Sequence, residues 1–514
     1  MLPSAVQQYL RETPLEQQDT GALAFLCALA EVARKSPPVA KAIVQELRDQ
    51  RSHLKLIASE NYSSLATQLA MGNWLTDKYA EGIPFQRFYE GCDNIDRVES
   101  FAVECAKKLF NAEHAYVQPH SGADANLIAL WAVLTVRVEL PALQTLGIKD
   151  PLQLAHEDWE KIRRTLNGQR LLGMDYMSGG HLTHGYRRNV SAKMFETFTY
   201  HVDRETGLLN YDRLAAQARE VKPLVLLAGY SAYPRRLNFA RLREIAEEVG
   251  AVLMVDMAHF AGLVAGGVFS DEYNPVPYAH IVTTTTHKTL RGPRGGLVLC
   301  TKEFAEAVDR GCPLVIGGPL PHVMAAKAVA LVEAGQPDFR EYAHAVVRNA
   351  QVLADACLRR GMHVLTGGTE NHIVLLNVVQ SYGLTGKQAA TALRECGVTL
   401  NFNSIPYDEN PPLIASGLRL GTPAVTTLGM GPEEMKEIAD IIHEVLSRVK
   451  PAPIQSGAQA GQLSKRQYLL EPEVRERAQA RVNELLQNYV LYPQLDADLL
   501  SAVCSPEAAC SAVS

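Results

Sequence analysis

Short apolar runs alternate with amphipathic segments through the middle of the chain. Aliphatic and β-branched residues dominate five runs between residues 198 and 300, a composition that favours strands: FTYHVD, PLVLLAG, AVLMVD, IVTTTT and LVLC. Apolar positions at helical spacing fill residues 239–249, between two of these runs. Strands that alternate with helices indicate βαβ units around a mostly parallel sheet. We therefore predict an α/β fold.

The pattern in the first two thirds of the chain predicts an arm and a large domain. Residues 1–55 have helical spacing with a break at Ser36-Pro37-Pro38, and we expect this arm to pack on a partner subunit. The large domain is predicted over residues 56–322 because it holds the alternating runs. Within it, residues 136–170 favour one or two amphipathic helices of their own.

The last third of the chain predicts a second domain and a tail. Residues 323–450 begin with a long helix and favour a smaller α+β domain, with strands at HVLTG (363–367) and HIVLLNV (372–378). Residues 451–514 begin with a linker rich in Pro, Gly, Gln and Ser, followed by one helix over 472–488 and a small-residue end. The sequence holds no internal repeat and no metal-ligand spacing.

One lysine follows a strand in a setting that suits chemistry. Lys288 comes after IVTTTT and His287, and a Gly-rich turn, RGPRGG, follows it. A partly desolvated amine at this place can form a Schiff base. The alternative is a solvated lysine on a loop, which is the ordinary state of the residue.

An acid follows the preceding predicted strand. The run AVLMVD ends in Asp256, with His259 just beyond it. Carboxyl ends of parallel strands gather at one edge of a sheet, where open α/β folds bind ligands. An acid and an amine at that edge suit pyridoxal phosphate, whose pyridine nitrogen needs a carboxylate and whose aldehyde needs a lysine.

Seven motifs in the chain resemble those of one family. They are LIASENY (56–62), KYAEG (78–82), QPHSG (118–122), GGHLTHG (179–185), VDMAH (255–259), TTTTHKTLRGPRGG (283–296) and LRLGTPA (418–424). In this order they resemble the serine hydroxymethyltransferases, which are pyridoxal-phosphate enzymes of fold type I. The resemblance runs from about residue 40 to 450. It implies a large domain with a mostly parallel sheet, a smaller α+β C-terminal domain, and shared active sites in a homodimer or a tetramer.

The resemblance also implies the roles of individual residues. The implied catalytic residues are Lys288, Glu81, His287 and Tyr89. The implied cofactor-binding residues are Ser121, Gly122, Ala123, His181, Ser231, Asp256, His259, Lys288, Tyr79, Gly317 and Gly318. The implied substrate-binding residues are Ser59, Tyr89, Arg419, Asn403, Tyr176, Gly180 and Leu182. In the family, Tyr79, Tyr89 and the two glycines reach the neighbouring subunit.

Each of these residue types also has an ordinary structural explanation. Ser59 could cap a helix, Ser121 could belong to a generic turn, and His181 could be a loop histidine. Arg419 could form a structural salt bridge, although a substrate carboxylate is an equally natural bidentate partner. We expect His184 to be structural.

The chain departs from the family pattern at several places. Phe88 stands where a tyrosine is common, and Ala123 stands where a serine is frequent. Ile316 lies where a glutamine is usual, and Pro411-Pro412-Leu413 replace a Ser-Pro-Phe near the folate. Residues 136–170 replace a short connection, and we expect them to cover the folate entrance or the subunit interface.

Composition limits the partners and the location. The chain has 514 residues and a formal net charge of −6, which gives no reason to expect nucleic acid or a membrane surface as a partner. Nine cysteines without a CxxC pair favour a reducing compartment. The first twenty residues lack the features of a targeting peptide, so the cytoplasm is the expected location. The apolar run 21–33 is too short to span a bilayer.

The expected reaction is the reversible transfer of the hydroxymethyl group of L-serine to tetrahydrofolate. The products are glycine and 5,10-methylenetetrahydrofolate. Two alternatives remain open at this point. One is a folate-independent aldolase for β-hydroxy amino acids, or a racemase, because these use the same cofactor chemistry. The other is an inactive scaffold or regulatory binding protein that has kept the fold.

Overall fold

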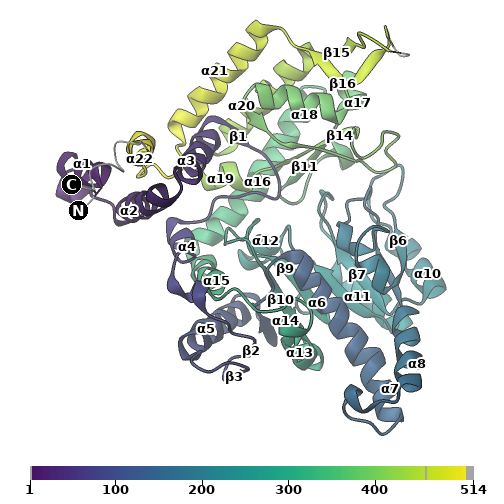
Figure 1. Cartoon of the computed structure of the whole chain (residues 1–514). Helices are drawn as coiled ribbons and strands as arrows, with labels where there is room; N and C mark the ends of the chain where they lie inside the picture. Colours follow the sequence, from purple (N-terminus) through teal and green to yellow (C-terminus); the bar gives the residue numbers. More distant parts are fainter. Residues whose placement is uncertain (1–2, 458–459, 505–514) are drawn as a thin grey trace.

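The structure is a computed structural model that describes residues 3–457 and 460–504. Figure 1 shows two lobes, a lower one built around a large sheet and an upper one with a small sheet. The large sheet has seven strands in the order β4-β10-β9-β8-β7-β5-β6. Their bounds are β4 His114–Tyr116, β5 Arg170–Met174, β6 Glu196–Tyr200, β7 Val225–Gly229, β8 Val252–Asp256, β9 Ile281–Thr285 and β10 Gly296–Cys300.

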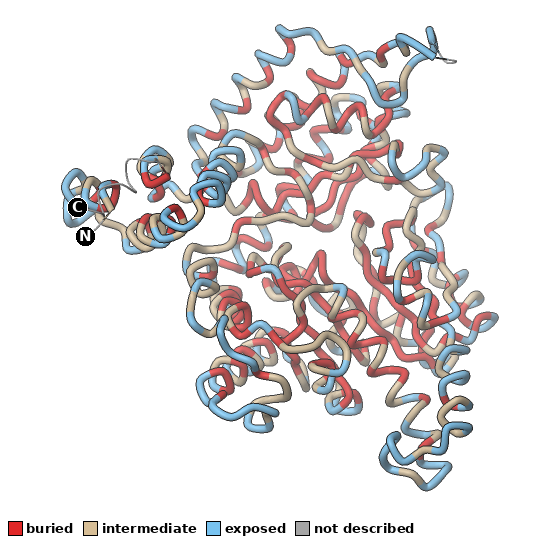
Figure 2. Tube along the Cα trace, viewed as in Figure 1, coloured by how far each residue is buried: buried red, intermediate tan, exposed pale blue. Residues whose placement is uncertain are grey.

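The large sheet is mostly parallel, as the alternating pattern predicted. The pairs β5–β6, β5–β7, β7–β8 and β8–β9 are parallel, and only β10 runs antiparallel to its two neighbours, β9 and β4. All five residues of β7, β8, β9 and β10 are buried, because helices cover both faces of the sheet. Figure 2 shows this buried centre in red. The predicted α/β fold is therefore confirmed.

Helices fill the two cores beside the sheet. The covering helices include α5 Asp93–Phe110, α6 Gly122–Leu134, α10 Tyr211–Val221, α11 Phe239–Val249 and α15 Pro321–Ala334. Gly122–Thr145 is long and apolar enough to cross a membrane by length and composition. Its first part, α6, packs on β9 and β10 and contributes eight buried residues. The apolar character of α6 is therefore that of a core helix.

The upper lobe has its own sheet and its own core. Its strands are β11 Ile373–Asn377, β14 Gly417–Gly421 and β13 Asn401–Asn403, paired antiparallel in that order. Its main helices are α18 Gly386–Glu395 and α20 Pro432–Arg448. The long helix α16, Pro337–Arg359, joins the lobes, because its first half packs in the large core and its second half in the upper one. Helix α15 packs on α5 in the large core.

Two predictions of local structure are wrong. HVLTG does not form a strand: Val364 makes one isolated bridge, and Leu365–Gly367 form a 3-10 turn. Thr366 has a φ of 57°, which an extended strand does not allow. The segment after residue 450 is not wholly a linker, because β15 Lys450–Pro453 pairs with β16 Leu463–Leu469. Prolines are tolerated there because the two-stranded hairpin has an open edge.

The two ends of the described chain pack together. The arm forms α1 Ser4–Glu12, α2 Thr20–Lys35 and α3 Pro37–Ser52, with the predicted break at Ser36. Helix α22, Ala497–Val503, packs on all three, and Figure 1 shows them together at the left. Helix α21, Pro472–Asn488, lies on α20, where the sequence predicted a helix. The predicted small-residue end, from residue 505 on, lies outside the described residues.

Arg51 binds three backbone carbonyls of the tail. The Arg51 guanidinium donates to the carbonyl oxygens of Leu491 (2.8 Å), Tyr492 (2.7 Å) and Leu495 (2.8 Å). The Tyr492 hydroxyl in turn donates to the carbonyl oxygen of Ser63 at 2.7 Å. Ser63 directly follows the LIASENY motif, so the tail supports a segment that leads to Ser59.

We expect the substitution Arg51→Met to loosen the tail. It removes three charge-assisted hydrogen bonds and should lower the free energy of unfolding by about 1–3 kcal/mol. Limited proteolysis would then cut after residue 488 sooner than in the parent protein. The control is Arg34→Met, because among the described residues Arg34 pairs only with the exposed Glu31 of its own helix, α2. Equal effects of the two substitutions would contradict the role given to Arg51.

Candidate active site

A cavity of about 520 Å³ lies at the carboxyl ends of the central strands, with the upper lobe as its other wall. Its lining combines residues beyond β7, β8 and β9 with residues of β13 and β14. The cavity brings together most of the predicted site residues: Ser59, Ser121, Gly122, Ala123, Tyr176, Gly180, His181, Leu182, Ser231, Asp256, His259, His287, Lys288, Asn403 and Arg419. Residues far apart in sequence therefore share one site.

Asp256, the last residue of β8, is a buried carboxylate held by three donors. Oδ2 accepts from Asn126 Nδ2 (2.8 Å) and from His184 Nε2 (3.1 Å), and Oδ1 accepts from the Ala258 amide (3.0 Å). His184 Nδ1 accepts from the His181 amide, so its proton lies on Nε2 and points to Asp256. Burial by itself would raise the pKa of Asp256, but the His184 hydrogen bond and the nearby cations hold that pKa below its usual value. The carboxylate stays charged.

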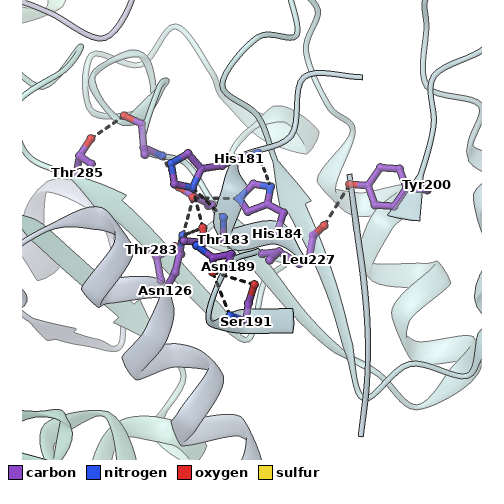
Figure 3. A network of polar contacts seen from close by, with 12 residues as sticks. Asn126, His181, Thr183, His184, Asn189, Ser191, Tyr200, Leu227, Thr283 and Thr285 are labelled. Carbon is purple, nitrogen blue, oxygen red and sulfur yellow. Dashed lines mark hydrogen bonds and ion pairs between the residues drawn. The ribbon is translucent and has the colours of Figure 1, made fainter. Parts of the chain in front are cut away.

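A network of hydrogen bonds fixes the groups around this carboxylate. Asn126 Nδ2 also donates to Thr183 Oγ1 (2.7 Å), and Thr283 Oγ1 donates to Asn126 Oδ1 (2.5 Å). Thr183 Oγ1 lies 2.8 Å from His181 Nδ1. Figure 3 shows these side chains converging from α6, from β9 and from the loop of GGHLTHG. The network ties His181 to the same frame as Asp256 and leaves Asp256 with one unused lone pair on Oδ1.

Lys288 lies just beyond β9, opposite Asp256. Burial lowers the pKa of its amine to about 8, although the charge of Asp256 raises it in part. Asn61 Nδ2 donates to the Lys288 carbonyl oxygen at 2.9 Å, which fixes the backbone. Burial also lowers the pKa of His181 to about 4 and that of His287 to about 3, so both imidazoles are neutral at pH 7. A neutral, flat imidazole such as His181 can stack on an aromatic ring.

The start of α6 forms an anion-binding corner of the cavity. Ser121 caps the helix, since its Oγ accepts from the Asp124 amide at 3.1 Å. The first amides of the helix, at Gly122 and Ala123, line the cavity and are free of intrahelical partners by geometry. A Cβ on Gly122 would lie 2.6 Å from Thr285 Cγ2, so only glycine lets the helix come this close to β9. These donors suit a phosphate.

Arg419 on β14 enters the cavity from the upper lobe. Nη1 donates to the Ser231 carbonyl oxygen at 2.6 Å, and Nε donates to Asn401 Oδ1 at 3.1 Å. Burial lowers the pKa of Arg419 to about 10, and the only charge that raises it comes from Tyr176. No acid among the described residues forms an ion pair with Arg419, so the structural salt bridge considered above is not found. Its remaining N–H groups can bind a carboxylate.

Five predicted residues lie outside the cavity and form a second cluster. Tyr89 Oη lies 3.4 Å from Glu81 Oε2, and the rings of Tyr79 and Tyr89 are 5.3 Å apart. Gly318 adjoins both Tyr79 and Glu81, and it follows Gly317. Tyr79 is 63% exposed and Tyr89 45%. In a single chain these residues have no access to the cavity lining.

His181, His184 and Asp256 also have the spacing of a metal site. One ligand atom from each lies within 4.8 Å of the others. However, His184 Nε2 already donates to Asp256, and His181 Nδ1 accepts from the Thr183 amide at 3.2 Å. Because His184 Nε2 and His181 Nδ1 are already used in these hydrogen bonds, we assign the group to the support of an organic ring.

Sequence reasoning missed part of the site. His184, which we expect to be structural, is buried and donates to Asp256, so it supports the carboxylate of the site. Asn126 and Arg294 also line the cavity. The one sequence signal that could have identified Asn126 is its polar side chain within the apolar helix α6.

Residues 136–170 form a π-helical turn followed by α7 Leu140–Thr145 and α8 His156–Asn167, and contribute nothing to the cavity lining. The expectation that they cover the folate entrance therefore has no support in a single chain.

The fold and the cavity together define a class. An amine beyond one parallel strand, a charged carboxylate at the end of the next and an anion-binding helix start match pyridoxal phosphate at its aldehyde, its pyridine nitrogen and its phosphate. The class is that of pyridoxal-phosphate enzymes of fold type I.

Comparison with known proteins gives the family. The family model for serine hydroxymethyltransferase matches residues 32–157 and 162–442. A serine hydroxymethyltransferase of Treponema pallidum (strain Nichols) is 59% identical over 499 residues, covering 97% of this chain and 86% of the relative. Those of Salinispora tropica and Chlamydia muridarum are 56% and 51% identical, covering 92% and 97% of this chain and 98% and 100% of the relatives. The chain belongs to the serine hydroxymethyltransferase family.

The lowered pKa of Lys288 predicts how the cofactor-free protein takes up pyridoxal phosphate. Attack on the aldehyde needs the neutral amine, so the uptake rate should rise about tenfold per pH unit up to about pH 8 and level off above it. Stopped-flow absorption would follow the uptake. In Asp256→Asn the level part should begin at lower pH, because the charge that raises the Lys288 pKa is gone. A rate that keeps rising to about pH 10, as for a free lysine, would contradict the prediction.

Proposed function

We propose that this protein transfers the hydroxymethyl group of L-serine to tetrahydrofolate, which gives glycine and 5,10-methylenetetrahydrofolate. Membership of the serine hydroxymethyltransferase family, at 51–59% identity over nearly the whole chain, supports this activity. The observation that carries it in the structure is the single cavity that unites Lys288, Asp256 and Arg419. No packing requirement explains an amine, a charged carboxylate and an unpaired guanidinium in one cavity.

Different residues of the cavity have different roles in this reaction. Pyridoxal phosphate, when bound, supplies an electron sink for negative charge at the Cα of the amino acid. Arg419 binds the α-carboxylate of serine with its free N–H groups, and Ser59 lies in the same cavity to assist it. Asp256, charged and desolvated, would hold the proton on the pyridine nitrogen. His181, held in place by Thr183, would stack on the ring.

The proposed binding site of the folate is the upper edge of the cavity. Asn403 lies in the lining there, on β13. The loop with Pro411, Pro412 and Leu413 is exposed, and the Leu413 side chain is 74% exposed. An exposed apolar side chain on the loop that joins β13 to β14 suits contact with a flat aromatic ligand. The change from the family pattern in this loop is the feature that favours the aldolase alternative.

We also propose that the active form is a homodimer with shared active sites. Glu81, Tyr79 and Tyr89 lie outside the cavity of their own chain, beside the strongly exposed rings of Phe85 (77%) and Phe88 (72%). A neighbouring apolar groove lies between α5 and α15: Val98, Phe101, Ala325, Ala328, Val329 and Val332. Exposed apolar surface of this kind marks an interface. A second copy seated there would receive Glu81 as its acid and base at the serine hydroxyl.

We place the protein in the cytoplasm. Eight described cysteines are free, and six of them are buried. Free thiols persist in a reducing compartment. The relatives named above are bacterial proteins, which agrees with this location.

The activity test measures glycine formed from L-serine with and without tetrahydrofolate. We expect rapid turnover only with the folate, and Lys288→Ala should lower it by about a thousandfold or more. The control is Lys149→Ala, at an exposed residue of the 136–170 segment, which should leave turnover unchanged. Equal serine cleavage without folate would favour the aldolase alternative. A protein that binds no pyridoxal phosphate would favour the scaffold.

Shared active sites predict complementation between two inactive variants. Glu81→Gln and Lys288→Ala each inactivate the homodimer, but a mixed dimer has one site with both residues intact. If the subunits mix at random, about half the dimers are mixed, and activity should recover to about one quarter of the parent value per subunit. Co-expression and a glycine assay test this. No recovery in a mixed dimer confirmed by mass spectrometry would mean that each chain completes its own site.

A further inference from the structure

Lys327 on α15 is a buried cation outside the cavity. Lys327 is only 2% exposed, although lysine is normally at the surface. Nζ donates to the carbonyl oxygens of Val117 (2.6 Å), Pro119 (2.8 Å) and Gly296 (2.9 Å). An ammonium has three N–H donors, so the three carbonyls satisfy it completely.

No acid neutralises this ammonium directly. Glu99 and Asp124 are the acids whose charge reaches it, but Glu99 pairs with Arg87 at 2.5 Å and Asp124 accepts from Ser121 Oγ at 2.9 Å. Burial lowers the pKa of Lys327 to about 7. An apolar side chain of similar volume often stabilises a fold as well as a buried charge does. The charge therefore needs an explanation other than the packing of α15.

The three carbonyls belong to the two segments that would hold the cofactor. Val117 and Pro119 lie in the turn between β4 and the anion-binding start of α6. Gly296 ends the segment that begins at Lys288 and opens β10. The segments are in direct contact, because the Gly296 amide donates to the Pro119 carbonyl oxygen at 3.0 Å and a Cβ on Gly296 would lie 2.1 Å from the Ser121 carbonyl oxygen.

The geometry leaves little freedom around the ammonium. A Cβ on Gly295 would lie 2.4 Å from Lys327 Cε, so the backbone passes closely over the lysine side chain. The Thr286 amide donates to the Gly295 carbonyl oxygen at 3.1 Å, and Thr286 Oγ1 donates to Pro293 at 2.6 Å. Hydrogen bonds from Thr286 thus close the loop that contains Lys288, and the end of this loop contacts the ammonium through the Gly296 carbonyl.

We propose that Lys327 is a positioning residue for the cofactor site, which fixes the phosphate-binding turn 117–122 relative to the segment 288–296 that carries the reactive amine. The ammonium acts through backbone carbonyls and touches neither cofactor nor substrate. This inference rests on the proposed pyridoxal-phosphate site. Lys327 on α15 would thereby set the distance between the groups that bind the phosphate of the cofactor and the amine that binds its aldehyde.

The test measures the affinity of the cofactor-free protein for pyridoxal phosphate. Lys327→Met keeps the volume and loses all three donors, and Lys327→Gln keeps two N–H donors without the charge. We expect the dissociation constant to rise about tenfold to a hundredfold in Lys327→Met and less in Lys327→Gln. Losses of this size are typical of residues that orient the binding groups of a site without touching the bound molecule. The control is Ile442→Ala, which opens a cavity in the upper core, at a residue with 0% exposure.

Rescue by small cations separates positioning from general stability. In Lys327→Ala, added ammonium or methylammonium ions can donate to the three carbonyls and should restore affinity, whereas tetramethylammonium has no N–H and should not. An unchanged dissociation constant in Lys327→Met, or an equal loss in Ile442→Ala, would overturn the inference. If the parent protein itself binds no pyridoxal phosphate, the proposed function fails first, and this inference falls with it.

Discussion

The buried carboxylate of Asp256 is the constraint on which the site depends. A charge at the end of a central strand is costly to bury, so it must be surrounded by donors. Here the donors come from α6, from the loop at residues 179–185 and from the backbone after β8. Satisfying one carboxylate therefore brings two distant segments, α6 and the loop 179–185, to the edge of the sheet where β8 ends, and the position of His181 follows from it.

Two buried cations, Arg419 and Lys327, are also surrounded by hydrogen-bond partners. Arg419 uses part of its guanidinium to bind Ser231 and Asn401, which aims the remainder into the cavity. Lys327 uses all of its donors on carbonyl oxygens and so has none for a ligand. A partly satisfied cation suits substrate binding, while a fully satisfied one suits the fixing of backbone. The number of unused donors distinguishes their roles.

The arm and the tail form a unit that the family model includes only in part. The match begins at residue 32 and ends at residue 442, whereas α22 packs on α1, α2 and α3. The unit contacts the segment after LIASENY through Tyr492 and Ser63. The extensions of this chain are therefore structurally connected with the substrate side of the site.

Local sequence patterns specify the alternation of strands and helices, the strand ends at Asp256 and near Lys288, and the helix cap at Ser121. These features follow from local patterns, because burial on both faces and helix capping depend on neighbours in the chain. The motifs also named most of the residues that line the cavity. HVLTG was mistaken for a strand because its apolar residues hid a backbone turn at Thr366.

Contacts between distant polar residues depend on how the helices pack on the sheet. His184 donates to a carboxylate 72 residues away, and Lys327 donates to a carbonyl 210 residues away, so no local pattern could reveal either contact. The structure also places Glu81 and the tyrosines outside the cavity of their own chain. The physical reason is that a folded chain must satisfy each buried charge with whatever donors and acceptors packing brings near. A sequence gives the identity of those groups, while the packing of helices on the sheet decides which of them meet.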